Sequence, residues 1–147
     1  MIEYLEINGI PSDEVTAALT QLYCRVFDVD QAGKLLQKMQ QAPDLHTVIA
    51  LSGQDMVGFK MGYRHKNFSF YSWVGGVDPS FRKQGIASNL MQIQHKYCWS
   101  NGYKVIRTKT ENRRRAMLIL NLQHGFDITG TYLSGDGRLK ILLEKKL

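Results

Sequence analysis

The spacing of hydrophobic residues along the chain predicts an alternation of strands and helices. Apolar residues at helical spacing predict four helices, at about residues 12–26, 31–40, 85–99 and 113–123. Short apolar runs bounded by turn residues predict seven strands, at residues 1–7, 45–51, 56–63, 68–77, 103–110, 126–133 and 138–144. The expected order is βαα-βββ-αβαββ. We therefore expect one domain over residues 1–147, of the α/β class with a mixed sheet.

One stretch, residues 74–88, joins a predicted strand to a predicted helix through a basic loop that contains glycine. It reads V-G-G-V-D-P-S-F-R-K-Q-G-I-A-S. Pro79 ends the strand, because proline fixes its own φ and has no amide proton. The first amides of a helix have no intrahelical partner and lie at the positive end of its dipole. Because Gly85 and Ala87 leave this backbone accessible and two cations precede it, the helix start predicts a phosphate site.

The loop differs from the common nucleotide-binding loops, since neither G-x-x-x-x-G-K-[ST] nor G-x-G-x-x-G after a strand is present. It carries [RQ]-x-x-G-x-[GA], realised as Arg82, Gly85 and Ala87. This motif in its strand-turn-helix context resembles the central motif of the GNAT superfamily of N-acetyltransferases. The expected element order is that of the GNAT fold across essentially the whole chain. The alternative interpretation is a solvated turn with Arg82 and Lys83 facing water, and the loop alone favours the phosphate site over it.

The resemblance implies that acetyl-coenzyme A is the cosubstrate and that the loop grips its pyrophosphate. A second stretch, residues 110–112, supports it, because family members often contact the pantetheine arm through an asparagine near this point. Many members also carry a tyrosine, on the helix that follows, that protonates the leaving thiolate. Here that position is close to Asn121, and the predicted helix 113–123 contains no tyrosine. The implied coenzyme-binding residues are Val77, Arg82, Lys83, Gln84, Gly85, Ile86, Ala87, Ser88, Asn112 and Asn121.

The chemistry of such a site requires an oxyanion donor and groups that move protons. A primary amine with a pKa near 10.4 is neutral in only about one molecule in two thousand at pH 7. By resemblance, the oxyanion donor is the backbone amide of Val77. The side-chain candidates for acid–base catalysis are Tyr71, Glu111 and Tyr132, each of which is more often structural than catalytic when taken alone. No aspartate or glutamate lies on the predicted strand 68–77, where some family members place a base.

The net charge of +6 is unevenly spread along the chain. Residues 1–30 hold six carboxylates against one arginine, which gives them a net charge of −5. The remaining residues therefore carry +11. The acidic excess favours a cationic acceptor, a small-molecule or peptide amine, although ordinary solvated helix faces explain it equally well. The steering residues would be Asp13, Glu14, Asp28 or Asp30. The basic residues between 82 and 115 leave two alternatives open, a nucleic-acid-binding domain, which is less favoured, and a non-catalytic acyl-coenzyme A sensor.

Composition is typical of a soluble globular domain, with 44% hydrophobic and 22% charged residues. No apolar run has the length of a membrane span, and the first residues do not read as a secretory signal. Cys24 and Cys98 are expected to be buried free thiols in a reducing cytoplasm. The four histidines show no ligand spacing, so no metal is predicted. A monomer or a homodimer fits the length of the chain.

Overall fold

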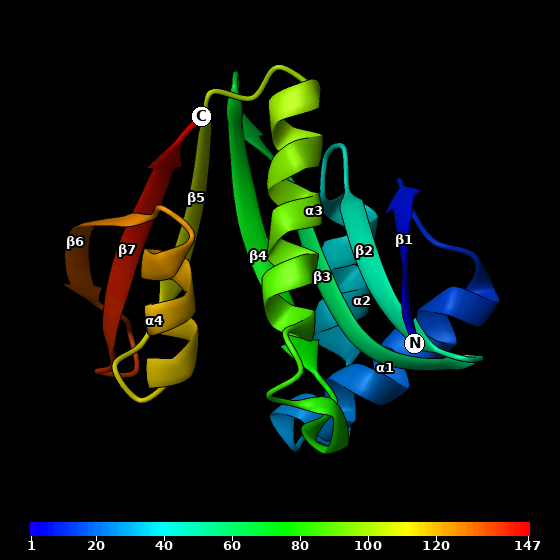
Figure 1. Cartoon of the computed structure of the whole chain (residues 1–147). Helices are drawn as coiled ribbons and strands as arrows, with labels where there is room; N and C mark the ends of the chain where they lie inside the picture. Colours follow the sequence, from blue (N-terminus) through cyan, green and yellow to red (C-terminus); the bar gives the residue numbers. More distant parts are fainter.

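The computed structural model describes all 147 residues, which form a seven-stranded sheet and four α-helices (Figure 1). The strands are β1 (Ile2–Asn8), β2 (His46–Ser52), β3 (Asp55–Lys66), β4 (Ser69–Val77), β5 (Val105–Thr110), β6 (Asp127–Leu133) and β7 (Leu139–Lys146). The helices are α1 (Asp13–Phe27), α2 (Gly33–Gln41), α3 (Ile86–Ser100) and α4 (Arg115–Gln123), with a 3-10 turn at Pro79–Phe81. The expected mixed α/β fold and element order are confirmed.

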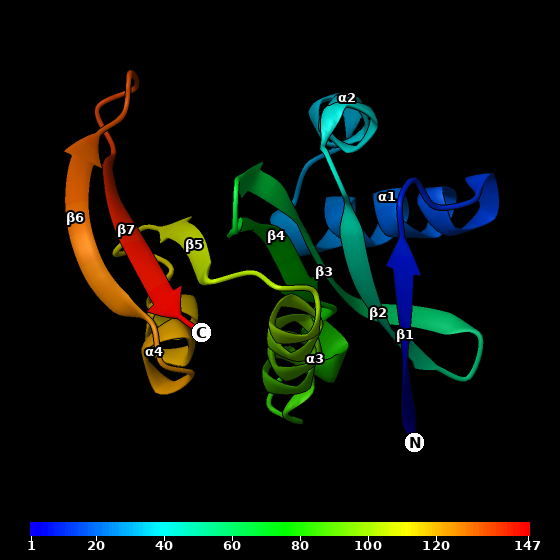
Figure 2. The ribbon, with the colours of Figure 1, turned by 90° about the horizontal axis from the view of Figure 1, so that it is seen from above.

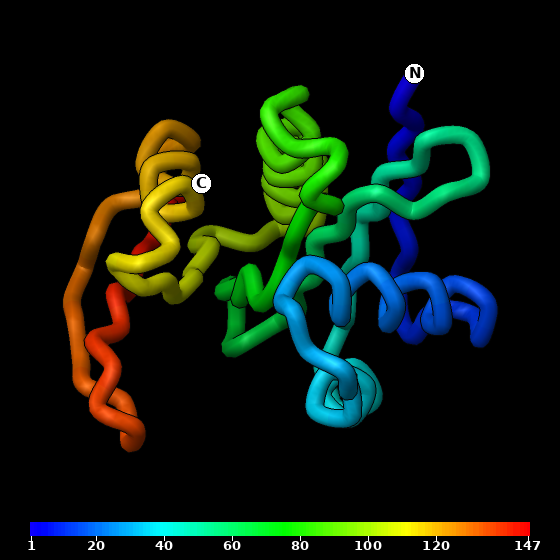
Figure 3. The backbone as a smooth tube through the Cα atoms, turned by 90° about the horizontal axis from the view of Figure 1, so that it is seen from below, coloured from blue at the N-terminus to red at the C-terminus, as the bar shows by residue number.

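The strands lie in the order β1-β2-β3-β4-β5-β7-β6, and only β4 and β5 run parallel. Helices α1 and α2 cover one face of the sheet, and α3 and α4 cover the other (Figure 2). The tube seen from below shows the same two layers (Figure 3). Alternate residues of the central strands supply both cores, as the period of two along a strand requires. Ile49 and Phe59 pack with α1 and α2, whereas Val48 and Ala50 pack beneath α3.

Pairing between β4 and β5 is short, and the two strands then diverge. Residues 69–71 of β4 pair with residues 105–107 of β5, in three residue pairs. Beyond them Trp73 is an extra residue in β4, because Ser72 lies opposite Gly62 and Val74 opposite Met61. Such a bulge bends its strand. We call the divergence of residues 72–77 of β4 from residues 108–110 of β5 the β4–β5 fork. Thr108 Oγ1 still donates to Ser72 O at 2.9 Å, and beyond this bond the two strands separate toward the start of α3 (Figure 1).

A separate hydrophobic cluster holds the C-terminal hairpin in place despite the short β4–β5 pairing. It joins Phe70 of β4 and Met91 of α3 to Phe126 and to Ile141 and Leu143 of β7. All five side chains are at most 5% exposed. Burial of a large apolar side chain stabilises a fold by roughly 1.5–3 kcal/mol. The fork is therefore closed firmly at its base, and it can stay open at its wide end.

The helix starts follow local chemistry. The Ser12 hydroxyl caps α1 by accepting from the Val15 amide at 3.3 Å, as the sequence predicts. Helix α4 begins at Arg115 and not at the predicted Arg113, because Arg113 and Arg114 lie in the preceding turn. None of the four helices combines the length and the apolar composition that a membrane crossing requires.

Candidate active site

The phosphate loop predicted from the sequence lies at the wide end of the fork, where β4 passes into α3. Gly85 precedes the helix with a φ of 80°, a left-handed conformation that favours glycine. No side chain caps this helix, and its first backbone bond runs from the Asn89 amide to Gly85 O at 3.0 Å. The amides of residues 86–88 therefore have no intrahelical acceptor. A Cβ on Gly85 would meet nothing within 4 Å, so the approach to these amides is open.

Side chains on both sides of the loop fix its position. Arg82 Nε donates to Val77 O at 3.1 Å, which ties the loop back to the end of β4. Asp78 accepts from the Ser80 amide at 2.9 Å and pairs with Arg25 of α1 at 3.2 Å. These contacts lower the pKa of Asp78, first through the backbone bond from Ser80. Arg82 thus has a structural contact that the sequence did not reveal, and its exposed neighbour Lys83 is free to face the opening.

The hydrogen-bond register of β4 decides which of its amides point into the fork. The Asp78 amide donates to Val57 O at 2.8 Å, so these two residues form a hydrogen-bonded pair. Because such pairs alternate with non-bonded ones, Val77, opposite Gly58, directs its amide away from β3 and into the fork. Gly75 has the same orientation two residues earlier. Val77 was the expected oxyanion donor; Gly75 was missed, because the sequence does not show the register.

The two tyrosines expected near the reacting atoms lie on either side of one lysine. Lys109 Nζ lies 5.9 Å from the ring centre of Tyr71 and 5.3 Å from that of Tyr132. Burial raises the pKa of the Tyr71 phenol to about 12. At neutral pH Tyr71 is therefore protonated, so it is suited to donating a proton and not to accepting one.

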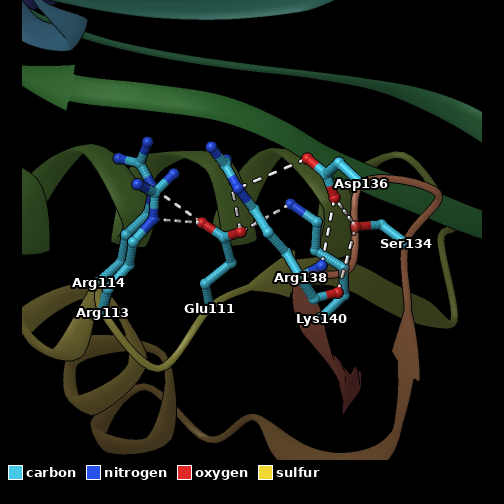
Figure 4. Close-up of polar contacts among 7 residues, drawn as sticks. All are labelled: Glu111, Arg113, Arg114, Ser134, Asp136, Arg138 and Lys140. Atoms are coloured by element: carbon cyan, nitrogen blue, oxygen red, sulfur yellow. Dashed lines mark hydrogen bonds and ion pairs between the residues drawn. The ribbon is translucent and has the colours of Figure 1, made fainter.

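Glu111, the third acid–base candidate, lies in a cluster of four cations at the end of β5 (Figure 4). Its carboxylate accepts from Arg113 Nε at 2.8 Å and from Lys140 Nζ at 3.0 Å. Arg138 and Arg114 lie farther away, at 3.8 and 3.9 Å. These hydrogen bonds, with Arg113 the largest cause, hold the pKa of Glu111 at about 2. Such a carboxylate is a poor proton acceptor, so this geometry argues against Glu111 as a general base and favours a structural role.

The two asparagines taken from the family resemblance differ in environment. Asn112 is exposed in the turn after β5. Asn121 is only 3% exposed, and its backbone carbonyl accepts from the amides of His124 and Phe126 at 3.1 Å each. The side chain of Asn121 makes no hydrogen bond to the protein, and its expected role in holding the coenzyme stays a prediction.

A partly buried polar cluster beneath α3 was not expected from the sequence. Lys145 Nζ lies 3.0 Å from His95 Nδ1, and Ser88 Oγ lies 2.8 Å from His124 Nε2, which joins α3 to the end of α4. The Nε2 atom of His95 is buried and has no partner. Desolvation first, then the charges of Lys145 and Lys60, lowers the pKa of His95 to about 3, so this histidine is neutral.

Lys60 is the central cation of this cluster. It lies on β3 opposite Gly75 and is 8% exposed, and it pairs with no carboxylate. Burial lowers its pKa to about 8. Gly58 faces Ile86 and Leu90 of α3, and Lys60, two residues further along the strand, faces the same side. An ammonium group therefore lies under α3, level with the Gly75 amide.

Two hollows lie outside the phosphate loop. One, of about 580 Å³, lies at the closed base of the fork and is lined by Tyr71, Trp73 and Lys109 among others. The other, of about 930 Å³, lies beside β1 and the second half of α3, and it is lined in part by Glu6 and Tyr97. The larger hollow contains none of the candidate site residues, whereas the smaller one contains Tyr71. We therefore take the smaller as the acceptor side of the site.

Comparison with known proteins identifies the family of this chain. The sequence profile described as Acetyltransferase (GNAT) family matches residues 16–126. The chain therefore belongs to the GNAT acetyltransferase family, and it is an acyltransferase. A search of curated proteins returned no match.

Solved structures share the fold at low sequence identity. The ribosomal-protein-S18-alanine N-acetyltransferase from Escherichia coli superimposes with a TM-score of 0.79 at 15% identity, covering 97% of this chain and 94% of that chain. PaiA N-acetyltransferase from Thermoplasma acidophilum, in complex with coenzyme A, gives 0.75 at 12% identity, covering 100% and 99%. The NatC complex bound to Gag peptide and CoA gives 0.76 at 20% identity, covering 99% and 98%.

The buried charge of Lys60 leads to a prediction about pH. Its pKa falls from 10.5 to about 8 on folding, so the unfolded chain binds more protons between these values and stability rises with pH there. Below pH 8 the cost of burying the charge is constant, at most about 3 kcal/mol. We expect Lys60→Met to raise the free energy of unfolding at pH 7, and we expect the gain to shrink toward pH 10. Urea denaturation at both pH values measures it.

The matched control is Lys66→Met, at the exposed end of the same strand. It should change stability little at either pH. A difference between Lys60→Met and the wild-type protein that stays constant from pH 7 to pH 10 would contradict a buried ammonium group.

Proposed function

We propose that this chain transfers an acetyl group from acetyl-coenzyme A to a primary amine, with the coenzyme bound in the β4–β5 fork. The uncapped start of α3 at the wide end of the fork is the observation that carries the proposal. A pyrophosphate there would accept hydrogen bonds from the free amides of residues 86–88 and meet the positive end of the helix dipole. The pantetheine arm carries amide groups of its own, and these suit the unpaired edge of β4.

The thioester would then lie beside the amides of Gly75 and Val77. Both amides point into the fork, and either can stabilise the oxyanion that forms when the amine attacks the carbonyl carbon. As the tetrahedral intermediate collapses, the carbon–sulfur bond breaks and the sulfur leaves as thiolate. We propose Tyr71, protonated at neutral pH and located at the base of the same fork, as the donor of a proton to that sulfur through intervening water. The phenolate regains a proton from the amine nitrogen, directly or through water, which balances the reaction without a carboxylate base.

The nucleic-acid alternative receives little support from the basic stretch. Arg113 and Arg114 both lie against Glu111, so their positions are set by contacts within the protein. Tyr103 is only 8% exposed, whereas Trp99 on α3 is 68% exposed. Stacking platforms for bases need several exposed aromatic rings interleaved with cations, and residues 82–115 supply one such ring, Trp99. A non-catalytic acyl-coenzyme A sensor would bind the coenzyme and release no thiol with any amine. The cytoplasmic location expected from the two free cysteines stays a prediction.

Gly85 provides the direct test of the coenzyme site. Gly85→Val places a branched side chain in the space before α3 and strains a left-handed backbone position. We expect the affinity for coenzyme A, measured by calorimetry, to fall at least about a hundredfold, as two charge-assisted hydrogen bonds would account for.

Gly53→Val is a matched control for the same strain. Gly53 also has a positive φ, 63°, and open space around its Cβ, but it lies in the β2–β3 turn. The Gly53→Val protein should lose stability and keep its affinity for coenzyme A. Equal losses of affinity in both variants, or no loss in Gly85→Val, would contradict the assignment of the coenzyme site to the start of α3.

Tyr71 provides the test of the chemistry. Because its pKa is about 12, the acid stays protonated while the acceptor amine loses its proton, so kcat/KM should rise through pH 9–10 without a fall caused by Tyr71. Tyr71→Phe should lower kcat about ten- to a hundredfold and leave coenzyme affinity unchanged. Tyr23→Phe, on α1, is the control. A descending limb between pH 8 and 10 that disappears in Tyr71→Phe would show that Tyr71 titrates in the ordinary range and that its assignment as a buried acid is wrong.

A further inference from the structure

The cavity at the base of the fork is lined by aromatic rings and by cations, which is unusual for a site that receives an amine. It has a volume of about 580 Å³, and its aromatic walls are Tyr63, Tyr71 and Trp73. These rings lie edge to face, with centres 5.6 Å apart for Tyr63 and Tyr71 and 6.2 Å apart for Tyr63 and Trp73. The three rings pack against one another, and together they offer an aromatic wall on which a flat apolar group can lie.

The charges that line this cavity are mainly positive. Lys38, Arg107 and Lys109 face it, and Glu144 is the only carboxylate among the lining residues. Glu144 is already paired with Arg107 Nε at 3.6 Å. The Nε atom of Arg107 is buried and makes no hydrogen bond. The cavity therefore carries more positive charge than its own carboxylate can neutralise.

Two of these cations have no carboxylate partner at all. Lys38 Nζ lies 5.0 Å from the ring centre of Tyr63, and Lys109 Nζ lies over Tyr71 and Tyr132. A cation over an aromatic face gains only about 0.5–2 kcal/mol, so each ammonium can still gain from an anion. The pKa of His65, at the rim of the cavity, is lowered by burial and then by the charges of its basic neighbours.

The acidic residues that were expected to steer a cationic acceptor are elsewhere. Asp13 and Glu14 lie in the first turn of α1, and Asp28 and Asp30 lie between α1 and α2. None of them lines the cavity. A ligand with only a positive charge would enter against the field of Lys38 and Lys109. The expectation of a cationic acceptor therefore finds no support in the cavity.

We propose that the acceptor is an amine that also carries an anionic group, a carboxylate or a phosphate, which Lys38 and Lys109 bind while the aromatic walls hold the part between. This inference rests on the proposed acetyl transfer, since it concerns the acceptor of that reaction. The anionic end would lie between α2 and β5, and the amine would extend past Tyr71 toward the amides of the fork. Binding both ends would fix the amine in line with the thioester.

The test uses amines that differ only at the far end of one ring. The acceptors are 4-(aminomethyl)benzoate and 4-(aminomethyl)phenylphosphonate, whose far ends are anionic, and 4-methylbenzylamine, whose far end is neutral; acetyl-coenzyme A is the donor and thiol release is the readout. We expect kcat/KM to be at least about tenfold higher for one or both anionic acceptors than for the neutral one. The carboxylate and phosphonate arms distinguish the two sources of negative charge. A wild-type preference for 4-methylbenzylamine would overturn the proposal.

Variants assign the preference to the two lysines. Lys38→Met and Lys109→Met should each bring the ratio of kcat/KM for anionic and neutral acceptors toward one. Lys34→Met, on α2 but outside the cavity, should keep the wild-type ratio. An unchanged ratio in both Lys38→Met and Lys109→Met would overturn the proposal, because the anion would then bind elsewhere.

A binding measurement separates failure of this inference from failure of the acetyl transfer. The nonreactive anion 4-methylbenzoate is titrated into the protein by NMR, with the neutral 4-methylbenzamide as its match. Shifts around Lys109 and Tyr71 with the anion alone support the anion site even if no amine is ever acetylated. Absence of such shifts overturns the anion site, even where coenzyme A binds and acetyl transfer is observed.

Discussion

The separation of β4 from β5 is the constraint on which the rest of this structure depends. Three residue pairs join the two strands, and the bulge at Trp73 then turns β4 away from its neighbour. Every later feature of the site follows from that divergence. The amides of Gly75 and Val77 would bond to β5 in a continuous sheet, and here they face an opening. The hydrophobic cluster around Phe70 allows this, because it holds the two halves of the sheet together at the base of the fork.

The charged residues around the fork differ by position in whether they have a partner of opposite charge. At the wide end, Arg82 and Asp78 hold the phosphate loop through contacts within the protein, which leaves the amides of α3 free. At the end of β5, Glu111 is enclosed by cations and acts as an anchor for the C-terminal hairpin. At the base, Lys109 has no carboxylate partner. We infer that the free cations mark where ligands bind, and that the paired ones maintain the shape of the fork.

Much of the fold could be predicted from the sequence, because strand and helix periods, the Ser12 cap and the Pro79 turn are local signals. The phosphate loop could be predicted for the same reason, since Gly85 and the helix after it are adjacent in the chain. The role of Glu111 could not, because Arg138 and Lys140 reach it only after the hairpin folds. Lys60 gave no signal either, since a lysine in a strand pattern usually faces solvent.

The central claim is that coenzyme A binds in the β4–β5 fork with its phosphates at the start of α3. Titration of the protein with coenzyme A, followed by backbone amide NMR, tests it most directly. We predict the largest shifts at Gly75, at Val77 and at residues 85–88, with little change around the larger hollow beside β1. Unchanged amides at residues 85–88, together with shifts at the residues lining that larger hollow, such as Glu6 and Tyr97, would contradict the claim.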